Sequence, residues 1–246
     1  MSAIATAPVA GESSLLRARS AAYALLARLL GSDPAGLTDA ATVTTLRKAL
    51  DTADRLAAAR LDELDASTLP DQKQLAGRWV RWFDLGRVAP YEGSNVATTV
   101  GGITPRLADV AGFYRAFGLT VIGDRPDHVV AQLEFLALAV LAEAEAIERG
   151  DLEHAQIAAS AVRSFLRDHI GGWIDAWAAR VGAIDELAPW FPYAAAAADL
   201  VRSEAANRNV IPVRDGAALP ADAGLADDED AVFDCQSDEG DPPPAD

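Results

Sequence analysis

The stretch Gly123-Asp-Arg-Pro-Asp-His-Val-Val-Ala-Gln-Leu-Glu-Phe-Leu136 has the pattern of a loop that enters a long helix. Asp124 is a residue type that caps helix N-termini, and Pro126 suits the first turn, where its missing N–H is not needed. Asp127 would then lie near the positive end of the helix dipole. We expect the helix to run to Glu148. Apolar residues at helical spacing predict its buried face, formed by Val129, Leu133, Leu136 and Val140.

The composition favours helices throughout the chain. Half of the 246 residues are hydrophobic, and they are rich in Ala and Leu, which are strong helix formers. No apolar run reaches the roughly 20 residues that a transmembrane helix needs, and residues 1–11 lack the basic start of a secretory signal. The only cysteine, Cys235, excludes a disulfide framework or a cysteine-ligated metal centre. We therefore expect a protein of the reducing cytoplasm.

The net charge of −16 is concentrated at the C-terminal end of the chain. From Asp215 onward there are 11 acidic residues and no Lys or Arg, and the remainder carries 26 acidic and 21 basic residues. The acidity therefore describes the tail and not the domain. No basic stripe is visible that would bind a nucleic-acid backbone, so we expect no nucleic-acid partner.

Helical periodicity continues on both sides of the opening stretch. It predicts a single all-α, bundle-like domain of about ten helices over residues 13–207, with Trp79, Trp82, Trp173 and Trp177 in its core. Residues 1–12 are expected to form a flexible N-terminus, and residues 208–246 a disordered, acidic, low-complexity tail. Further helices are expected near residues 14–30, 39–56 with a break within 51–65, 71–85, 104–117, 151–170, 173–181 and 192–207.

Known catalytic patterns are missing from the sequence. There is no nucleophile elbow, phosphate-binding loop or dinucleotide fingerprint. A di-iron bundle needs Glu-x-x-His pairs on facing helices, whereas the nearest pattern, Asp151-x-x-His154, occurs once at a helix start. Glu143 and Glu145 are interpreted as a solvated helix face. We expect no catalysis, cofactor or metal, although a metal protein or enzyme using His128 and Glu134 stays open as an alternative.

Two segments contain polar residues that the helical pattern does not explain. The first is Pro90-Tyr91-Glu92, in the middle of a long irregular stretch from residue 86 to 104, a kind of segment that is more often functional than accidental. The second covers Asp124 to Glu134. Together with the helical layout, these motifs resemble the TorD/DmsD/NarJ group of cytoplasmic chaperones, which serve molybdoenzymes exported through the twin-arginine pathway. The resemblance covers roughly residues 14–206.

The match to that group holds residue by residue in most positions. Tyr91 and Glu92 match its Tyr-Glu loop, and Pro126-Asp127-His128 matches its helix-entry motif. Leu133-Glu134-Phe135 matches the apolar, acidic and aromatic run that follows. The departures from the group's pattern are Gly93 where Ser is frequent, Gln132 where Glu is frequent, and Leu136 where Met is frequent.

The resemblance implies a chaperone that binds the twin-arginine signal peptide, the apo form, or both, of a molybdopterin oxidoreductase, as a monomer or a domain-swapped dimer. Such a peptide is apolar with two adjacent arginines, so its receptor needs an apolar groove with acids at the rim. The implied acids are Glu92, Asp124, Asp127 and Glu134, with Tyr91, Pro126 and His128 beside them. We expect His128 to be a neutral, hydrogen-bonding imidazole. A purely structural interaction subunit remains a further alternative.

Overall fold

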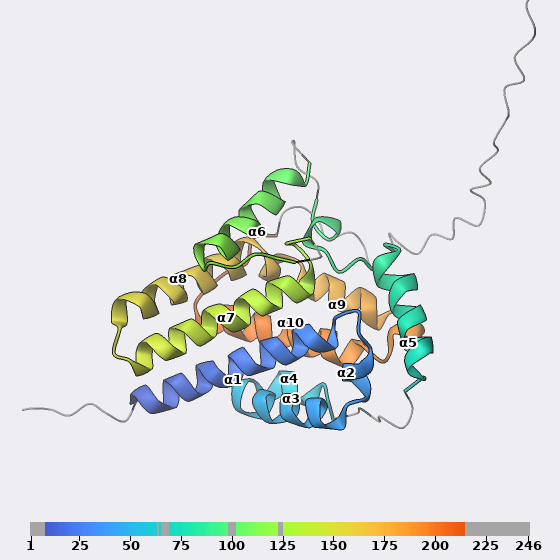
Figure 1. The fold of residues 1–246 in the computed structure, drawn as a ribbon, viewed down its shortest axis with the longest axis horizontal. Helices are drawn as coiled ribbons and strands as arrows, with labels where there is room; N and C mark the ends of the chain where they lie inside the picture. Colours follow the sequence, from blue (N-terminus) through green and yellow to red (C-terminus); the bar gives the residue numbers. More distant parts are fainter. Residues whose placement is uncertain (1–7, 63, 65–68, 98–101, 123–124, 215–246) are drawn as a thin grey trace, which may run out of the picture.

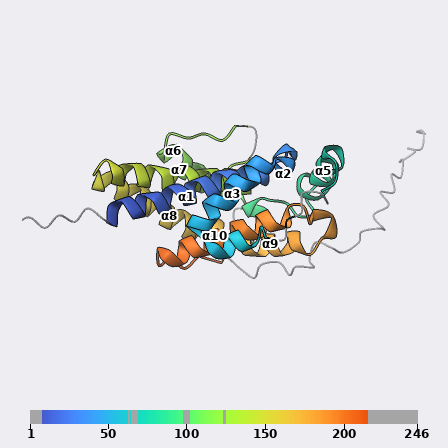
Figure 2. The ribbon, with the colours of Figure 1, turned by 90° about the horizontal axis from the view of Figure 1, so that it is seen from below.

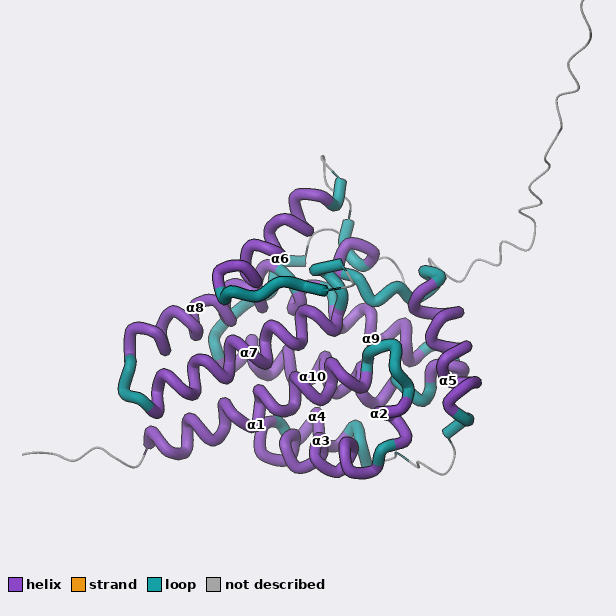
Figure 3. Tube along the Cα trace, viewed as in Figure 1, coloured by secondary structure: helices purple, strands orange, loops and turns teal. Residues whose placement is uncertain are grey.

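The computed structural model describes residues 8–62, 64, 69–97, 102–122 and 125–214. Figure 3 shows helices joined by loops and no strand in this part of the chain, so the predicted all-α class is confirmed. The α-helices are α1 (Pro8–Leu29), α2 (Ala35–Thr38), α3 (Ala40–Ala53), α4 (Arg55–Ala59), α5 (Gln72–Trp79), α6 (Thr104–Ala116), α7 (Val129–Glu148), α8 (Leu152–Asp168), α9 (Ile174–Gly182) and α10 (Phe191–Asn207). Shorter segments are the π-helical turn η2 (Val80–Asp84) and the 3-10 turns η3 (Glu92–Ser94), η4 (Ile170–Gly172) and η5 (Asp185–Leu187).

Helix α7 lies at the centre of the fold. It runs antiparallel to α1 on one side and to α8 on the other (Figure 1). Figure 2 shows α9 and α10 on one side of the α1–α7 pair and α6 on the opposite side. The predicted apolar face of α7 is confirmed, because Val129, Leu133, Leu136 and Val140 are all fully buried. The four tryptophans expected in the core are buried as well.

The start of α7 differs from the prediction. The helix begins at Val129, and its N-cap is His128, whose Nδ1 accepts the N–H of Val130 at 3.1 Å. Asp127 and Pro126 therefore precede the helix. The Asp and Pro pattern satisfied local capping rules, but the main chain at this point is engaged by a segment some 35 residues earlier. A long-range pairing thus overrides the local signal.

Other helix boundaries test the local rules in the same way. The predicted break in the second helical region is confirmed at Asp54, whose carboxylate accepts the N–H of Ala57 and caps α4. The predicted helix over 71–85 is α-helical only to Trp79 and continues as the π-helical turn η2. Most of the predicted tail, residues 215–246, lies outside the described residues. The start of the predicted tail, residues 208–214, is described, and there the N–H of Val213 donates to the carbonyl of Arg167 at 2.7 Å.

The interpretation of Glu143 as a solvated residue is wrong. Glu143 is 8% exposed, and its carboxylate accepts a bond of 2.7 Å from Arg208, which follows α10. Arg208 also pairs with the buried Glu204, and Glu204 lies 3.1 Å from Arg19 of α1. These buried charges join α1, α7 and α10. Burial of a charge is tolerated here because each one has an opposite charge beside it.

Candidate functional site

The loop before η3 is paired with the start of α7 through the main chain. Tyr91 and His128 form an isolated antiparallel bridge. The N–H of Glu92 donates to the carbonyl of Asp127 at 2.9 Å, and the N–H of Val129 donates to the carbonyl of Pro90 at 2.8 Å. The two motifs singled out from the sequence are therefore in direct contact, although 36 positions separate Tyr91 from Asp127.

Glu92 is fully buried and collects partners from three elements. Its Oε1 accepts a bond of 2.6 Å from Arg106 of α6 and lies 3.2 Å from Nδ1 of His169. Its Oε2 accepts a short hydrogen bond from the side-chain amide of Gln132 on α7. The carbonyl oxygen of that amide accepts the indole N–H of Trp173 at 3.2 Å. This network gives a reason for Gln132: a glutamate there would place a second carboxylate against Glu92.

Asp127 is also fully buried. Arg125 binds it with two hydrogen bonds, from Nε to Oδ1 at 2.9 Å and from Nη2 to Oδ2 at 2.6 Å. The N–H of Gly93 adds a third bond, 3.0 Å long, to Oδ2. The prediction that Glu92 and Asp127 stand as open acids at a rim is therefore wrong for this structure, because both carboxylates are inside the fold and hold arginines of the chain itself.

Gly93 has no room for a side chain. A Cβ built on it would lie 1.6 Å from Cδ1 of Ile103, which precedes α6. Ile103 thus fills the space in which a serine side chain would lie, and this explains the departure from the Ser that is frequent at this position.

His128 and Pro126 connect this region to the aromatic core. The ring of His128 meets the ring of Tyr91 edge-on, with 5.0 Å between centroids. Because Nδ1 of His128 accepts a hydrogen bond, it carries no proton, which fits the predicted neutral imidazole. The carbonyl of Pro126 accepts the hydroxyl of Tyr114 on α6 at 2.7 Å, and burial raises the pKa of Tyr114 well above its ordinary value.

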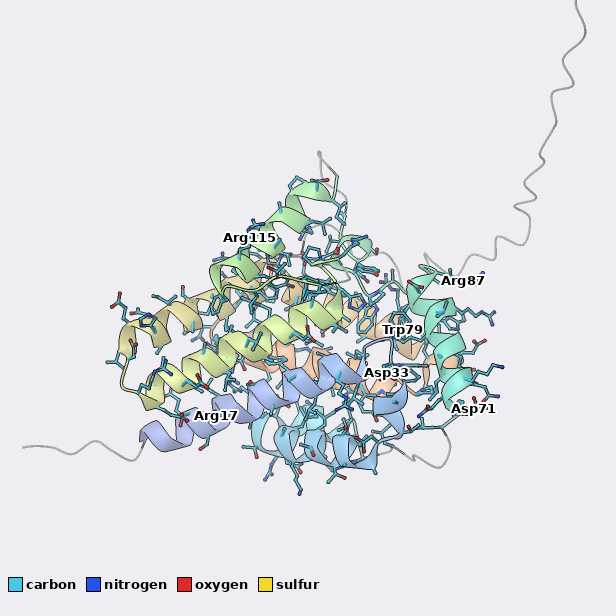
Figure 4. All side chains as sticks on the ribbon, in the orientation of Figure 1. Arg17, Asp33, Asp71, Trp79, Arg87 and Arg115 are labelled. Carbon is cyan, nitrogen blue, oxygen red and sulfur yellow. The ribbon has the colours of Figure 1, made fainter. Side chains whose placement is uncertain are left out.

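A groove of about 440 Å³ lies beside these residues. One wall is α7, and another is the loop segment 119–122 after α6, which Figure 3 shows running along α7. Trp79 also lines the groove; Figure 4 shows it on the side of α5 that faces the body of the molecule. Leu138 and Ile122 line the groove and are 44% and 94% exposed. Glu134 is exposed at its edge, and His128 lines it from the Tyr91 side.

The predicted site residues thus separate into three groups. Five of them, Tyr91, Glu92, Pro126, Asp127 and His128, lie together, and Glu134 lies at the edge of the groove. Asp124 falls outside the described residues. Sequence reasoning missed three residues that complete the arrangement, namely Arg106, Arg125 and His169. Only Arg125 carried a usable signal, because it stands two residues from an aspartate within the motif itself.

Neither a metal cluster nor a membrane span is found in the described part of the chain. Its His, Asp and Glu side chains form no group of three or more that could hold a metal ion. None of its helices combines the length and the apolar character that crossing a membrane requires.

Comparison with known proteins identifies the family. Curated proteins yield no match to this sequence. A family model described as "Nitrate reductase delta subunit" matches residues 47–179, which is more than half of the chain and extends from α3 to α9. The matched region contains the Tyr91–His128 bridge and the groove-lining part of α7. The chain therefore belongs to the nitrate reductase delta subunit family, whose members are maturation chaperones for molybdoenzymes.

Proposed function

We propose that this chaperone binds the twin-arginine leader of a molybdopterin oxidoreductase catalytic subunit, and the apo subunit that carries it, in the groove between α7 and residues 119–122. It acts in the cytoplasm, catalyses no reaction, and masks the leader until the cofactor is inserted. The observation that carries this proposal is the groove itself: an exposed aliphatic surface with an acidic edge, next to the paired motifs.

The groove has the chemistry that such a peptide needs. Leu138 and Ile122 offer apolar surface that is exposed in the free chain, so covering it with an apolar segment is favourable. Glu134 makes no ion pair among the described residues, and its carboxylate is available to a guanidinium of the peptide. Among the described acids of the predicted set, Glu134 is the one whose side chain is exposed at the groove in the free chain.

The test is a titration with a synthetic twin-arginine leader peptide against paired variants. Leu138→Asp places a charge in the groove, whereas Ile157→Asp makes the same kind of change on α8, outside the groove, at a residue that is 56% exposed. Losing about 1 kcal/mol of apolar contact weakens binding about fivefold. We expect Leu138→Asp to lose at least this much and Ile157→Asp to bind like the unmodified chain.

The same titration separates the alternatives. If Ile157→Asp loses binding and Leu138→Asp does not, the client contacts α8 and the groove proposal fails. If a folded catalytic subunit binds but the leader peptide does not, the chain is an interaction subunit that does not recognise the leader.

A further inference from the structure

Asp127 and Tyr91 together form a site for a guanidinium group, and in the free chain Arg125 fills it. The two carboxylate oxygens of Asp127 accept hydrogen bonds from Nε and Nη2 of Arg125. The face of the Tyr91 ring lies 4.5 Å from the central carbon of the same guanidinium. A bidentate carboxylate with an aromatic face is the arrangement that distinguishes arginine from lysine.

Burial is unequal within this pair. The Asp127 side chain is fully buried, whereas the Arg125 side chain is 42% exposed. Arg125 therefore covers the carboxylate from the solvent side. Its removal would leave a desolvated carboxylate that still accepts the N–H of Gly93, and such a group attracts another cation.

A second arginine pair in the molecule shows what an ordinary local contact looks like. Arg167 binds Asp168 with bonds of 2.8 and 2.6 Å, nearly the same geometry. Both of those side chains are partly exposed, at 54% and 32%. No aromatic ring contact with Arg167 is found among the described residues. The Arg167 pair thus matches the bond geometry of the Arg125 pair and lacks its burial and its ring.

The guanidinium site is continuous with the groove. The Tyr91 ring that lies against Arg125 contacts the ring of His128, and His128 lines the groove. On the proposed function, a peptide whose apolar segment lies along α7 would extend past His128 toward the Tyr91 ring and the exposed side of Arg125.

We propose that Arg125 occupies the client's arginine site in the free chaperone and that a client arginine displaces it. This inference rests on the proposed function and names the group recognised and the residue that competes with it. Because one arginine replaces another, the exchange itself contributes little to affinity. It gives selectivity instead: a lysine offers one point charge and cannot restore the two-bond contact with Asp127.

The first experiment tests the site without any client. Thermal melts of the full chain are measured for Arg125→Ala, Arg125→Lys and Arg167→Ala, with and without ethylguanidinium, and with ethylammonium at the same concentration. We expect ethylguanidinium to raise the melting temperature of the two Arg125 variants by about 2 °C or more over ethylammonium. The unmodified chain and Arg167→Ala should not show this difference. Equal effects of both additives on all variants would overturn the proposal.

The second experiment adds the client. Leader peptides with two arginines or two lysines are titrated into the unmodified chain and Arg125→Ala. Removal of the competitor should tighten binding of the arginine peptide about tenfold and leave the lysine peptide nearly unchanged. Weaker binding of the arginine peptide would make Arg125 a structural support and overturn the proposal. Binding of neither peptide to any form, with ethylguanidinium rescue intact, would instead refute the proposed function and leave the guanidinium site standing.

Discussion

Glu92→Gln should separate a structural acid from a client-binding acid. The substitution keeps the shape of the side chain and removes its charge. Arg106 and His169 then lose an anionic partner, and Gln132 loses a carboxylate acceptor. Removing one member of a buried ion pair costs about 3–5 kcal/mol. Because the Arg106 side chain is 18% exposed and can be partly hydrated, we expect a loss of about 2–4 kcal/mol in the free energy of unfolding.

The measurement is urea unfolding of Glu92→Gln beside Glu134→Gln. Glu134 is exposed, so its substitution should change the free energy of unfolding by less than about 0.5 kcal/mol. Under conditions where both variants are folded, Glu134→Gln should weaken leader binding and Glu92→Gln should leave it near that of the unmodified chain. A Glu92→Gln variant that unfolds normally and fails to bind would refute the reasoning, because it would show that this buried acid contacts the client.

Two further predictions concern packing and pH. Gly93→Ser should destabilise the fold by about 1–3 kcal/mol, because its Cβ overlaps Ile103. In calorimetric melts, the double variant Gly93→Ser/Ile103→Ala should recover much of the melting temperature that Gly93→Ser loses. Equal melting temperatures for the single and the double variant would contradict the overlap. Burial raises the pKa of Tyr193 from its ordinary value of 10.0 to about 12, so the folded state favours the neutral phenol. The contribution of Tyr193 to the free energy of unfolding is therefore full below pH 10 and is lost as the pH rises toward 12. Urea unfolding across this range should show a shallower loss of stability for Tyr193→Phe, and identical slopes would contradict the assignment.

Local patterns predicted those parts of the fold that depend on neighbours in sequence. The stripe from Val129 to Val140 follows from helical spacing alone, and the break between α3 and α4 falls within the predicted range of residues 51–65. The same rules placed the start of α7 too early, because they count a proline and an aspartate as helix signals. They have no knowledge of the loop at Tyr91 that pairs with this segment. Glu143 was misread for the same reason, since its partner Arg208 lies 65 residues away.

The candidate site shows a similar division. The motifs that contain Tyr91 and Asp127 were recognisable in the sequence, and the structure brings them into contact. The burial of Glu92 was not predictable, because its partners Arg106 and His169 lie far from it in sequence and carry no motif. Arg125 stands next to the recognised residues, yet only the structure shows that it already binds the Asp127 carboxylate, which the sequence prediction assigned to a client. Residue type and spacing identified the segments that form the candidate site, and the ion pairs of Glu92 and Asp127 showed that these acids are not open to solvent.

The bridge between Tyr91 and His128 also has a consequence for the chain between them. It brings both ends of the intervening segment, which contains α6, to one point of the main body. The entropic cost of closing such a loop grows only with the logarithm of its length, so lengthening the segment by half would cost about 0.4 kcal/mol. Insertions between Ser94 and Ile103 would leave the bridge and the ends of the segment in place. We therefore expect this part of the chain to accept a change in length at little cost in stability, while the central bundle stays the same.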